Sequence, residues 1–367
     1  MTTLPPDLAQ RVVRWQGHSG RHDLPWQGTR DAYRVWLSEV MLQQTQVATV
    51  LAYYPRFVAR FADVRALAAA PFDDVLALWS GLGYYSRARN LQRCAQVVVA
   101  EHGGEFPRSA QALARLPGIG RSTAAAIAAF CFGERAAVLD GNVRRVLARV
   151  LGFERDLARA DGERALWQLA QTLLPAREVD VYTQGLMDLG ATVCLARAPH
   201  CAACPLAEVC VAHRKGRPLA YPVKLRRSAR SRRSHALLWL TRGGRCWLAR
   251  RPEQGVWAGL WSLPEFATAA ALEDVVRGWP GHGHWLEPLE HALTHFDWTL
   301  QPLRWQLPAR SPPPDLCALG AGRWFTRDAA LSLGLPAPVR RWLQTSSLPT
   351  PARRATVQPT TTFLSRR

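Results

Sequence analysis

The pattern of apolar and polar positions divides the chain into a helical part and a part that contains strands. From residue 8 to about residue 212, apolar residues recur at intervals of three and four, which is typical of amphipathic helices packed on a core. Proline and glycine separate these periodic stretches at the positions where helices end. We therefore expect a mostly α domain over residues 1–215.

Beyond residue 235 the period changes. The segment HALLWLTRGGRCWLARR (235–251) predicts a strand, a Gly-Gly turn and a second strand, and HALTHFDWTLQPLRWQL (291–307) is also β-rich. These stretches predict an α+β domain over residues 236–345. Residues 346–367 are rich in Ser, Thr, Pro and Arg with little to bury, so we expect a disordered tail.

A basic segment, residues 216–235, separates the two expected domains. Six of the ten residues from Lys224 to Arg233 are basic and none is acidic. Such a run is typical of a solvated linker, and it suits equally well a path along a phosphate backbone.

Composition indicates the kind of partner that the chain binds. The chain has 367 residues, enough for two domains, and a net charge of +19, which favours nucleic acid. An arginine-rich composition typical of a high-GC genome is the alternative reading of that charge. No apolar run reaches membrane-spanning length and the first residues lack a secretory signal layout, so we expect a cytoplasmic protein with no membrane partner.

Four of the eight cysteines fall in CLARAPHCAACPLAEVC, with gaps of six, two and five residues. They are Cys194, Cys201, Cys204 and Cys210. Thiolates this close together can converge on zinc or on an iron–sulfur cluster. Zinc sites usually contain two Cys-x2-Cys pairs, and this segment contains one. The other four cysteines are scattered and are most simply buried apolar residues.

The segment LPGIGRSTAAAI (116–127) predicts a tight turn before a helix. Gly118 and Gly120 permit close backbone approach, and a helix that begins near Arg121 directs its N–H groups at an anion, for which phosphate is the natural candidate. An ordinary turn between two helices is the alternative. Ser122 has no histidine nearby to deprotonate it, which disfavours a serine nucleophile.

Two carboxyl groups are candidates for acid–base chemistry. Asp140, in AVLDGNVRRVLAR, stands at the start of a helix and is expected to cap it. Glu39, in YRVWLSEVMLQQTQVATVL, is the one acid of an amphipathic helix. A solvated glutamate is one possibility. An apolar setting would instead raise its pKa and keep it protonated near neutrality, as a general acid requires.

These motifs together resemble a known superfamily. The cysteine spacing after a helix-rich region is similar to the [4Fe-4S] loop of the endonuclease III superfamily, and LPGIG is similar to its helix–hairpin–helix. The stretch around Glu39 closely resembles the corresponding helix of adenine DNA glycosylases. The resemblance covers roughly residues 10–340. It implies a mostly α helix–hairpin–helix glycosylase fold with one [4Fe-4S] cluster per chain, held in the loop 194–210.

The resemblance also implies residue roles. Glu39 protonates adenine, Asp140 stabilises the sugar cation, and Asn142 lies beside Asp140. Ser122 stands where bifunctional members carry a Schiff-base lysine, so we expect a monofunctional enzyme. Tyr84 would act as a wedge in the DNA and Gln44 would fill the gap beside the opposite base. The implied DNA contacts are Gln44, Thr45, Tyr84, Gly118, Gly120, Arg121, Ser122, Thr294 and His295, and the implied adenine pocket is Leu24, Trp26 and Gln184.

The second domain resembles a Nudix fold through RPEQGVWAGLWSLPEF (251–266). The sequence ATAAALEDVVRGW follows where a Nudix hydrolase needs a Glu-rich, Mg²⁺-binding helix, so we expect a binding domain and not a hydrolase. Residues 251–266 resemble the Nudix-related C-terminal domain of adenine DNA glycosylases, and this resemblance implies recognition of 8-oxoguanine. The family's lesion-probing loop usually contains Phe-Ser-His. Here Leu293, Thr294 and His295 match it, and the aromatic side chain is lost.

These observations favour a monomeric, nucleoid-associated glycosylase that removes adenine paired with 8-oxoguanine or guanine in double-stranded DNA. A bifunctional glycosylase/lyase like endonuclease III is the nearest alternative, disfavoured by Ser122 and by the extra domain. A non-catalytic iron–sulfur DNA-binding protein is the other, disfavoured by Glu39 and Asp140.

Overall fold

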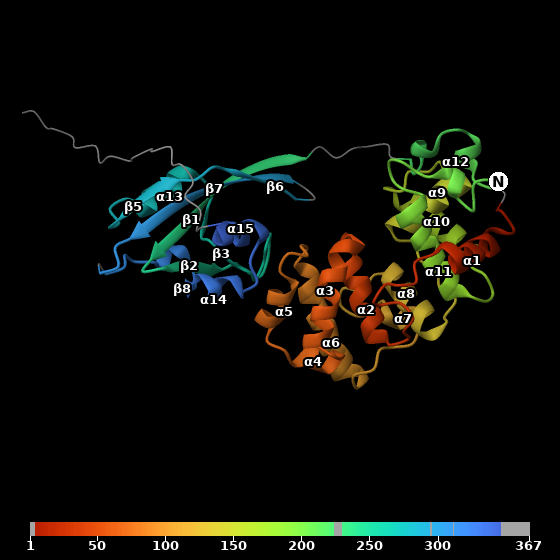
Figure 1. Ribbon diagram of the computed structural model, residues 1–367, viewed down its shortest axis with the longest axis horizontal. Helices are drawn as coiled ribbons and strands as arrows, with labels where there is room; N and C mark the ends of the chain where they lie inside the picture. Colours follow the sequence, from red (N-terminus) through yellow and green to blue (C-terminus); the bar gives the residue numbers. More distant parts are fainter. Residues whose placement is uncertain (1–3, 224–229, 294–295, 311, 346–367) are drawn as a thin grey trace, which may run out of the picture. The chain divides into compact units, whose positions relative to one another are not determined.

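The computed structural model describes residues 4–223, 230–293, 296–310 and 312–345, and these fold into two compact units (Figure 1). The first unit joins Met1–Ala70 to Arg87–Arg227, and the second joins Pro71–Ser86 to Ser228–Arg367. A short segment from the N-terminal half of the sequence is therefore part of the second unit. Within the described residues, no helix is both long and apolar enough to cross a membrane.

The first unit is helical, as the spacing of apolar residues predicts. Several helices begin at a side-chain cap: Asp31 accepts hydrogen bonds from the Tyr33 and Arg34 amides, and Asp63 accepts one from the Ala66 amide. Its helices are α1 (Leu8–Ser19), α2 (Ala32–Leu42), α3 (Val47–Arg60), α4 (Val64–Ala69), α6 (Ser86–His102), α7 (Ala110–Leu113), α8 (Arg121–Phe132), α9 (Gly141–Leu151), α10 (Ala160–Thr172), α11 (Val179–Asp188) and α12 (Val211–Arg214), with short π and 3-10 turns at Leu189–Val193, Cys201–Ala203 and Pro218–Ala220.

One hydrophobic core of this unit joins α1, α8, α9, α10 and α11. Leu8 and Val12 of α1 are fully buried and share the core with Tyr182 and Leu186 of α11, which lies beside α1 (Figure 1). The helix α9 is strongly amphipathic, so one of its faces lies in this core. The positions of Asp140 at the start of α9 and of α11 are consequently fixed by packing.

The turn between α7 and α8 packs closely against α6, and glycine permits this approach. Gly118 has a left-handed backbone (φ +75°), and a Cβ atom there would lie 2.6 Å from the Asn90 Cβ. Gly120 directly precedes α8, whose buried Ala124–Ala129 segment packs closely, and α2 lies against α8. The helix expected near Arg121 therefore begins there, and the packing places it beside the helix that carries Glu39.

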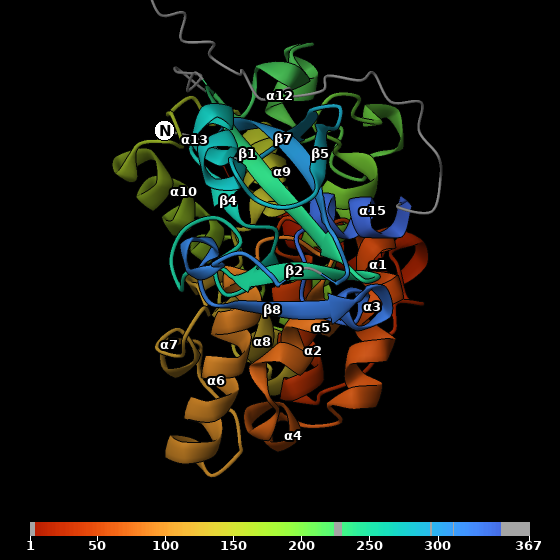
Figure 2. The same cartoon turned by 90° about the vertical axis from the view of Figure 1, so that its left-hand side faces the viewer.

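The second unit contains an eight-stranded mixed sheet. Its long central strands, β1 (Ser231–Arg242) and β7 (Phe296–Leu307), pair in parallel, and β2 (Arg245–Arg250) and β8 (Gly322–Thr326) extend the sheet (Figure 2). Gly243 and Gly244 form the predicted turn between β1 and β2, both with positive φ. The remaining strands are β3 (Trp261–Ser262), β4 (Glu265–Phe266), β5 (His282–Trp285) and β6 (Leu289–Ala292).

Helices complete the second unit: α5 (Phe72–Trp79), α13 (Ala269–Val276), α14 (Arg327–Leu331) and α15 (Ala337–Thr345), with a 3-10 turn at Cys317–Leu319. Leu272 and Val276 of α13 pack on Leu238 and Leu240 of β1, which forms the core on one face of the sheet. The α+β class is thus confirmed. Strand β1 begins at Ser231, inside the segment expected to be a linker, whereas residues 224–229 and the tail 346–367 lie outside the described residues.

Candidate active site

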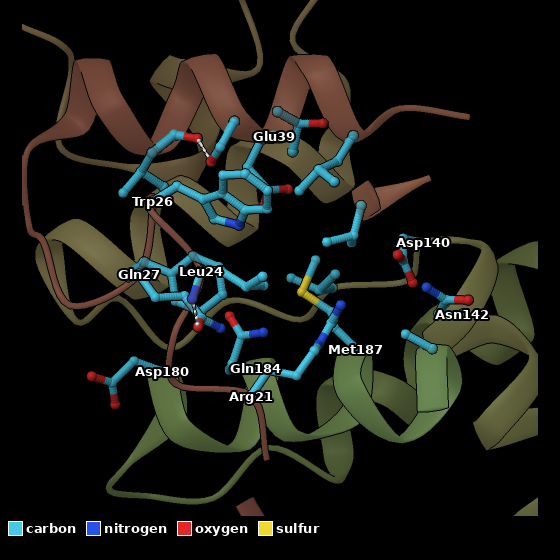
Figure 3. Close-up of a pocket in the computed structure, with 18 of the residues that line it drawn as sticks. Arg21, Leu24, Trp26, Gln27, Glu39, Asp140, Asn142, Asp180, Gln184 and Met187 are labelled. Atoms are coloured by element: carbon cyan, nitrogen blue, oxygen red, sulfur yellow. Dashed lines mark hydrogen bonds between the residues drawn. The ribbon is translucent and has the colours of Figure 1, made fainter. Parts of the chain in front are cut away.

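A cavity of about 910 Å³ opens inside the first unit, a size typical of ligand pockets (Figure 3). Its walls come from α2, from the starts of α8 and α9, from α11, and from the segments that precede and follow α2. Many residues singled out in the sequence line it. They are Leu24, Trp26, Glu39, Gln44, Thr45, Ser122, Asp140, Asn142 and Gln184.

Glu39 projects into this cavity from the middle of α2 and is half-buried. Burial raises the pKa of its carboxyl group to about 8, and the negative charge of Asp140 contributes to the same shift. Val40 and Met41, which follow Glu39 in the helix, are buried and apolar. Glu39 therefore carries a proton at neutral pH.

Asp140 faces the same cavity from the N-terminus of α9, on the opposite side from Leu24 and Trp26 (Figure 3). Its Oδ1 accepts a hydrogen bond from the Val143 amide at 2.7 Å, so it caps the helix as its sequence position predicts. Burial raises its pKa, whereas this bond and the charge of Arg145 lower it. Burial is the largest of these effects, so the pKa of Asp140 is raised overall, and the helix terminus opposes that rise.

Asn142 is fixed by an arginine that sequence reasoning missed. Nη2 of Arg145 donates to Asn142 Oδ1 at 2.8 Å and to the Gly190 carbonyl at 2.6 Å, while Nε donates to the Cys194 carbonyl at 2.8 Å. One guanidinium therefore links the start of α9 to the turn that follows α11 and to the cysteine segment. Arg145 lies three residues after Asn142 on the same helix, and this spacing could have predicted the contact between the two side chains.

The wall formed by α11 depends on a buried acid that was also missed. Asp188 is fully buried and accepts hydrogen bonds from the Arg21 backbone amide at 3.0 Å and from Arg21 Nε at 2.8 Å. It also accepts one from Gln184 Nε2 at 2.9 Å. Arg21 and Gln184 both line the cavity, so Asp188 orients two polar groups there without facing the cavity itself.

The apolar side of the cavity comes from the segment before α2. Trp26 is 8% exposed, and its ring meets the edge of Tyr54 at a centroid distance of 5.4 Å. Leu24 lies beside it, with its backbone amide bonded to Gln27 Oε1 (Figure 3). A flat aromatic base fits between such apolar walls and the polar groups on α11.

Gln44 and Thr45 lie at the cavity edge, directly after α2. Gln44 is exposed and has a left-handed backbone (φ +56°), which directs the chain sharply away from the helix. The buried guanidinium of Arg87 donates to the Val40 and Met41 carbonyls and to Thr45 Oγ1, at 2.8 to 3.0 Å. Arg87, which the sequence did not single out, thus holds the end of α2.

Of the hairpin residues singled out in the sequence, Ser122 lines the cavity and the others lie outside it. Ser122 lines the cavity, and its Oγ accepts a hydrogen bond from the Leu139 amide at 3.0 Å, which ties α8 to the strand-like segment before Asp140. The guanidinium of Arg121 lies 3.9 Å from the ring centroid of Trp167. Gly118 and Gly120 shape the turn and do not line the cavity.

Two sets of expected DNA contacts lie in the second unit. Tyr84 is 43% exposed and has a left-handed backbone (φ +49°). The Leu293 amide donates to the Phe296 carbonyl at 3.0 Å, next to the start of β7. Thr294 and His295 lie outside the described residues.

The four clustered cysteines are half-buried and line one small apolar cavity with Val146, Leu189 and Leu206. Arg149, 2% exposed, donates from Nη1 to Cys194 Sγ at 3.3 Å and to the Leu195 carbonyl at 2.7 Å. In the described part of the chain, no three His, Cys, Asp or Glu side chains gather closely enough to hold a single metal ion.

Comparison with known families agrees with this geometry. Residues 37–172 match the HhH-GPD superfamily of base excision DNA repair proteins, and residues 235–345 match the NUDIX domain. The chain is similar to a thermostable thymine-DNA glycosylase of known structure, with a TM-score of 0.51 and 30% identity over 56% of this chain and 95% of that one. The fold and the cavity therefore define a DNA glycosylase of the HhH-GPD superfamily.

Relatives in sequence identify the family within this superfamily. The chain is 32% identical over 341 residues to the adenine DNA glycosylase of Buchnera aphidicola subsp. Acyrthosiphon pisum, covering 92% of this chain and 97% of that protein. It is 35% identical over 389 residues to the human adenine DNA glycosylase, covering 86% and 70%. The chain belongs to the adenine DNA glycosylase family and is an enzyme of base excision repair.

Proposed function

We propose that this glycosylase hydrolyses the bond between deoxyribose and an adenine that is paired with 8-oxoguanine or guanine, and that it leaves the DNA strand intact. One observation carries the reaction: two carboxyl groups line the same cavity, Glu39 with its pKa raised to about 8 and Asp140 bonded to the first turn of a helix. This combination of a protonated acid and an ionised neighbour is the arrangement used to cleave glycosidic bonds.

The proposed chemistry balances with water as the second reactant. Glu39 gives its proton to N7 of adenine, and the bond between C1′ and N9 breaks with its electron pair remaining on adenine. The carboxylate of Asp140 stabilises the positive charge that develops on the sugar. Ionised Glu39 then takes a proton from water as the water oxygen bonds to C1′. The products are free adenine and an abasic site, and Glu39 is again protonated.

Ser122 supports a reaction without strand cleavage. A lyase step needs an amine that forms a Schiff base with C1′, and a hydroxyl group forms none. Ser122 Oγ also accepts a hydrogen bond from the Leu139 amide, a structural task. We therefore assign it no nucleophilic role.

We propose that adenine leaves the base stack and enters the cavity between Leu24, Trp26 and Gln184. Apolar surface from Leu24 and Trp26 suits the faces of the base, and Gln184, oriented by Asp188, can hydrogen-bond to its edge. Gln44 fills the space left in the duplex and Tyr84 inserts beside the opposite base.

The remaining contacts in our proposal follow the phosphate backbone. The hairpin with Gly118 and Gly120 presents the N-terminus of α8 to a phosphate, aided by Arg121, while Thr45 supports the strand near the cavity. The net charge of +19 favours this binding and makes it sensitive to salt. We propose that the enzyme acts as a monomer on the DNA of the nucleoid.

We propose that Cys194, Cys201, Cys204 and Cys210 hold one [4Fe-4S] cluster. Zinc sites usually contain two Cys-x2-Cys pairs, and residues 194–210 contain one. The four thiols line one apolar cavity, and as thiolates they would be the ligands of an iron–sulfur cluster. The cluster would order residues 194–210 beside α9 and take no part in bond cleavage.

We assign recognition of 8-oxoguanine to residues 236–345, with Thr294 and His295 contacting the lesion. Residues 269–276 form α13, and its sequence AAALEDVV lacks the carboxylate-rich face that a Mg²⁺-dependent Nudix hydrolase needs. The domain therefore acts as a reader in our proposal.

A panel of duplexes tests the proposal. Labelled adenine is placed opposite 8-oxoguanine, guanine, cytosine or thymine, and products are scored with and without alkali. We expect excision opposite 8-oxoguanine and guanine, and strand breaks only after alkali. Breaks without alkali, together with a borohydride-trapped adduct, would show a lyase.

A further inference from the structure

The loop Ser80–Tyr85 after α5 displays one side chain and buries its neighbours. Tyr84 is 43% exposed, whereas Ser80, Leu82 and Tyr85 are 5–9% exposed. Tyr84 also has φ +49°, a left-handed conformation that tyrosine rarely adopts. Such a backbone persists only where surrounding contacts hold it, so the contacts of this loop decide where Tyr84 points.

Those contacts converge on one carbonyl oxygen near the end of the chain. The Leu335 carbonyl accepts a hydrogen bond from Ser80 Oγ at 3.0 Å and another from Tyr85 Oη at 3.0 Å. Tyr85 Oη in turn accepts one from the Gly81 amide at 3.4 Å. Both ends of the six-residue loop are therefore fastened to a residue 250 or more positions away in the sequence.

An arginine holds the segment that supplies this carbonyl. Arg340 donates from Nη1 to the Leu331 carbonyl at 2.7 Å and from Nη2 to the Leu333 carbonyl at 2.8 Å, while its Nε lies 3.2 Å from Ser80 Oγ. One guanidinium thus shapes the turn between α14 and α15 and contacts the Tyr84 loop directly.

The turn between α14 and α15 also packs closely against α5. A Cβ atom on Gly334 would lie 2.6 Å from the Leu76 Cβ, so the turn can approach α5 only because residue 334 is glycine. At the other end of α5, Asp73 pairs with Arg250 of β2 at 3.0 Å. The segment Pro71–Ser86 lies within the glycosylase match of residues 37–172, and yet it folds as part of the second unit.

We propose that the turn between α14 and α15, through Leu335 and Arg340, positions Tyr84 for insertion into DNA. The C-terminal part of the chain then acts on DNA in two ways: it carries the expected lesion contacts, and it sets the conformation of an inserting side chain that the N-terminal half supplies. This inference rests on the proposed role of Tyr84 in DNA binding.

A double-mutant cycle tests it in the full-length protein. Tyr85→Phe removes only the hydroxyl group that joins Leu335 to Gly81. The probe is a duplex with 8-oxoguanine opposite 2′-fluoro-deoxyadenosine, which binds without being cleaved. We expect Tyr84→Ala to weaken binding about tenfold, the size of a lost stacking contact. Tyr85→Phe should weaken it about threefold alone and have no further effect in the Tyr84→Ala protein.

Tyr33→Phe is the matched control, since Tyr33 Oη is a buried donor to the Phe61 carbonyl at 2.7 Å, in the first unit. It should leave binding unchanged in both backgrounds. Ser80→Ala, which removes the other donor to Leu335, should reproduce Tyr85→Phe. Amide hydrogen exchange supplies a readout without DNA: Tyr85→Phe should accelerate exchange in residues 81–85, and Tyr33→Phe should not.

The outcomes distinguish the positioning role of Leu335 from the insertion of Tyr84 into DNA. Equal effects of Tyr85→Phe in both backgrounds, or unchanged exchange in the loop, would overturn the positioning role of Leu335 while leaving Tyr84 a DNA contact. Full binding by Tyr84→Ala would instead overturn the proposed insertion of Tyr84 and this inference with it. Adenine excision by Glu39 is measured independently of either.

Discussion

The negative charge of Asp140 raises the pKa of Glu39, with which it shares one cavity. Burial is the larger cause, and together they bring the pKa of Glu39 to about 8. Asp140 keeps its own ionised form accessible through the Val143 amide and the charge of Arg145. The charge of Asp140 therefore favours the protonated form of Glu39 that a general acid needs.

We first expect a pH profile with a descending limb near pH 8. Only protonated Glu39 can donate to adenine, so single-turnover excision should fall as pH rises through about 8. Asp140→Asn should lower the overall rate and move this midpoint to lower pH, because it removes a charge that disfavours ionisation of Glu39. A rate that stays constant from about pH 6 to pH 10 would contradict the role of Glu39.

Glu39→Gln should separate activity from stability. Loss of the acidic proton should reduce single-turnover excision by at least about 10²–10⁴-fold with little change in DNA affinity. The folded pKa of about 8 exceeds the ordinary 4.5, so the stability that protonated Glu39 contributes is fully present below about 4.5 and is lost as pH rises through about 8. At about pH 9 the variant should therefore resist urea better than the unaltered protein.

Glu101→Gln, an exposed change on α6, is the control for that comparison and should alter neither property. Near wild-type excision by Glu39→Gln would mean that another group is the acid.

Asp188→Asn should damage the α11 wall of the cavity. The change removes the charge that fixes Arg21 and weakens the bond to Gln184. Breaking a buried ion pair costs about 3–5 kcal/mol, and the partial exposure of Arg21 places the expected loss below that range, at about 1–3 kcal/mol. Urea unfolding measures it, and excision should slow as well. Asp180→Asn, which changes another carboxyl at the same cavity, should cost far less.

The purified protein should contain about four irons per chain and absorb broadly near 400 nm. Cys201→Ser should lower iron content, folding yield and DNA binding, because it removes one of the four thiolates that we propose hold the cluster. Excision by the fraction that remains folded and bound should change little. One zinc and no iron in metal analysis would refute the assignment.

Local sequence signals predicted the helices and strands well. They could not predict contacts between residues that are far apart in the sequence. Asp140 was recognisable as a cap and Glu39 as an isolated acid on a helix, because both signals lie within one or two turns. Arg87 and Asp188 gave no such signal, since Met41, to which Arg87 donates, lies 46 residues away and Arg21, which pairs with Asp188, lies 167 residues away. The same holds for α5, whose amphipathic pattern indicates a buried face without indicating which unit buries it.

The arginines at the start of β1 show the same effect. Their charge suggested a solvated linker, whereas Arg232 and Arg233 pair in parallel with Asp297 and Trp298 of β7. A parallel partner more than 60 residues away leaves no turn signal beside the strand. Only the fold reveals that this basic segment adjoins the start of β7, which follows Thr294 and His295 in the sequence.

That arrangement makes Arg230 the subject of the last prediction. Arg230 donates to the Leu293 carbonyl at 2.5 Å and pairs with Asp297 at 2.7 Å, so it links the residue after β6 to the start of β7. Loss of this clamp should loosen the loop that we propose reads 8-oxoguanine. Arg230→Gln should therefore reduce the preference for adenine opposite 8-oxoguanine over adenine opposite guanine, by about three- to tenfold for one lost charge-assisted contact.

Excision opposite guanine should persist in Arg230→Gln, because Glu39 and Asp140 lie in the other unit. Arg242→Gln controls for the loss of one positive charge: Arg242 lies at the far end of the same strand and donates to the Ala309 carbonyl at 3.2 Å. Measured as the ratio of single-turnover rates on the two duplexes, the preference should fall only in Arg230→Gln. An equal fall in both variants would assign the effect to charge, and an unchanged ratio in both would remove the clamp from lesion recognition.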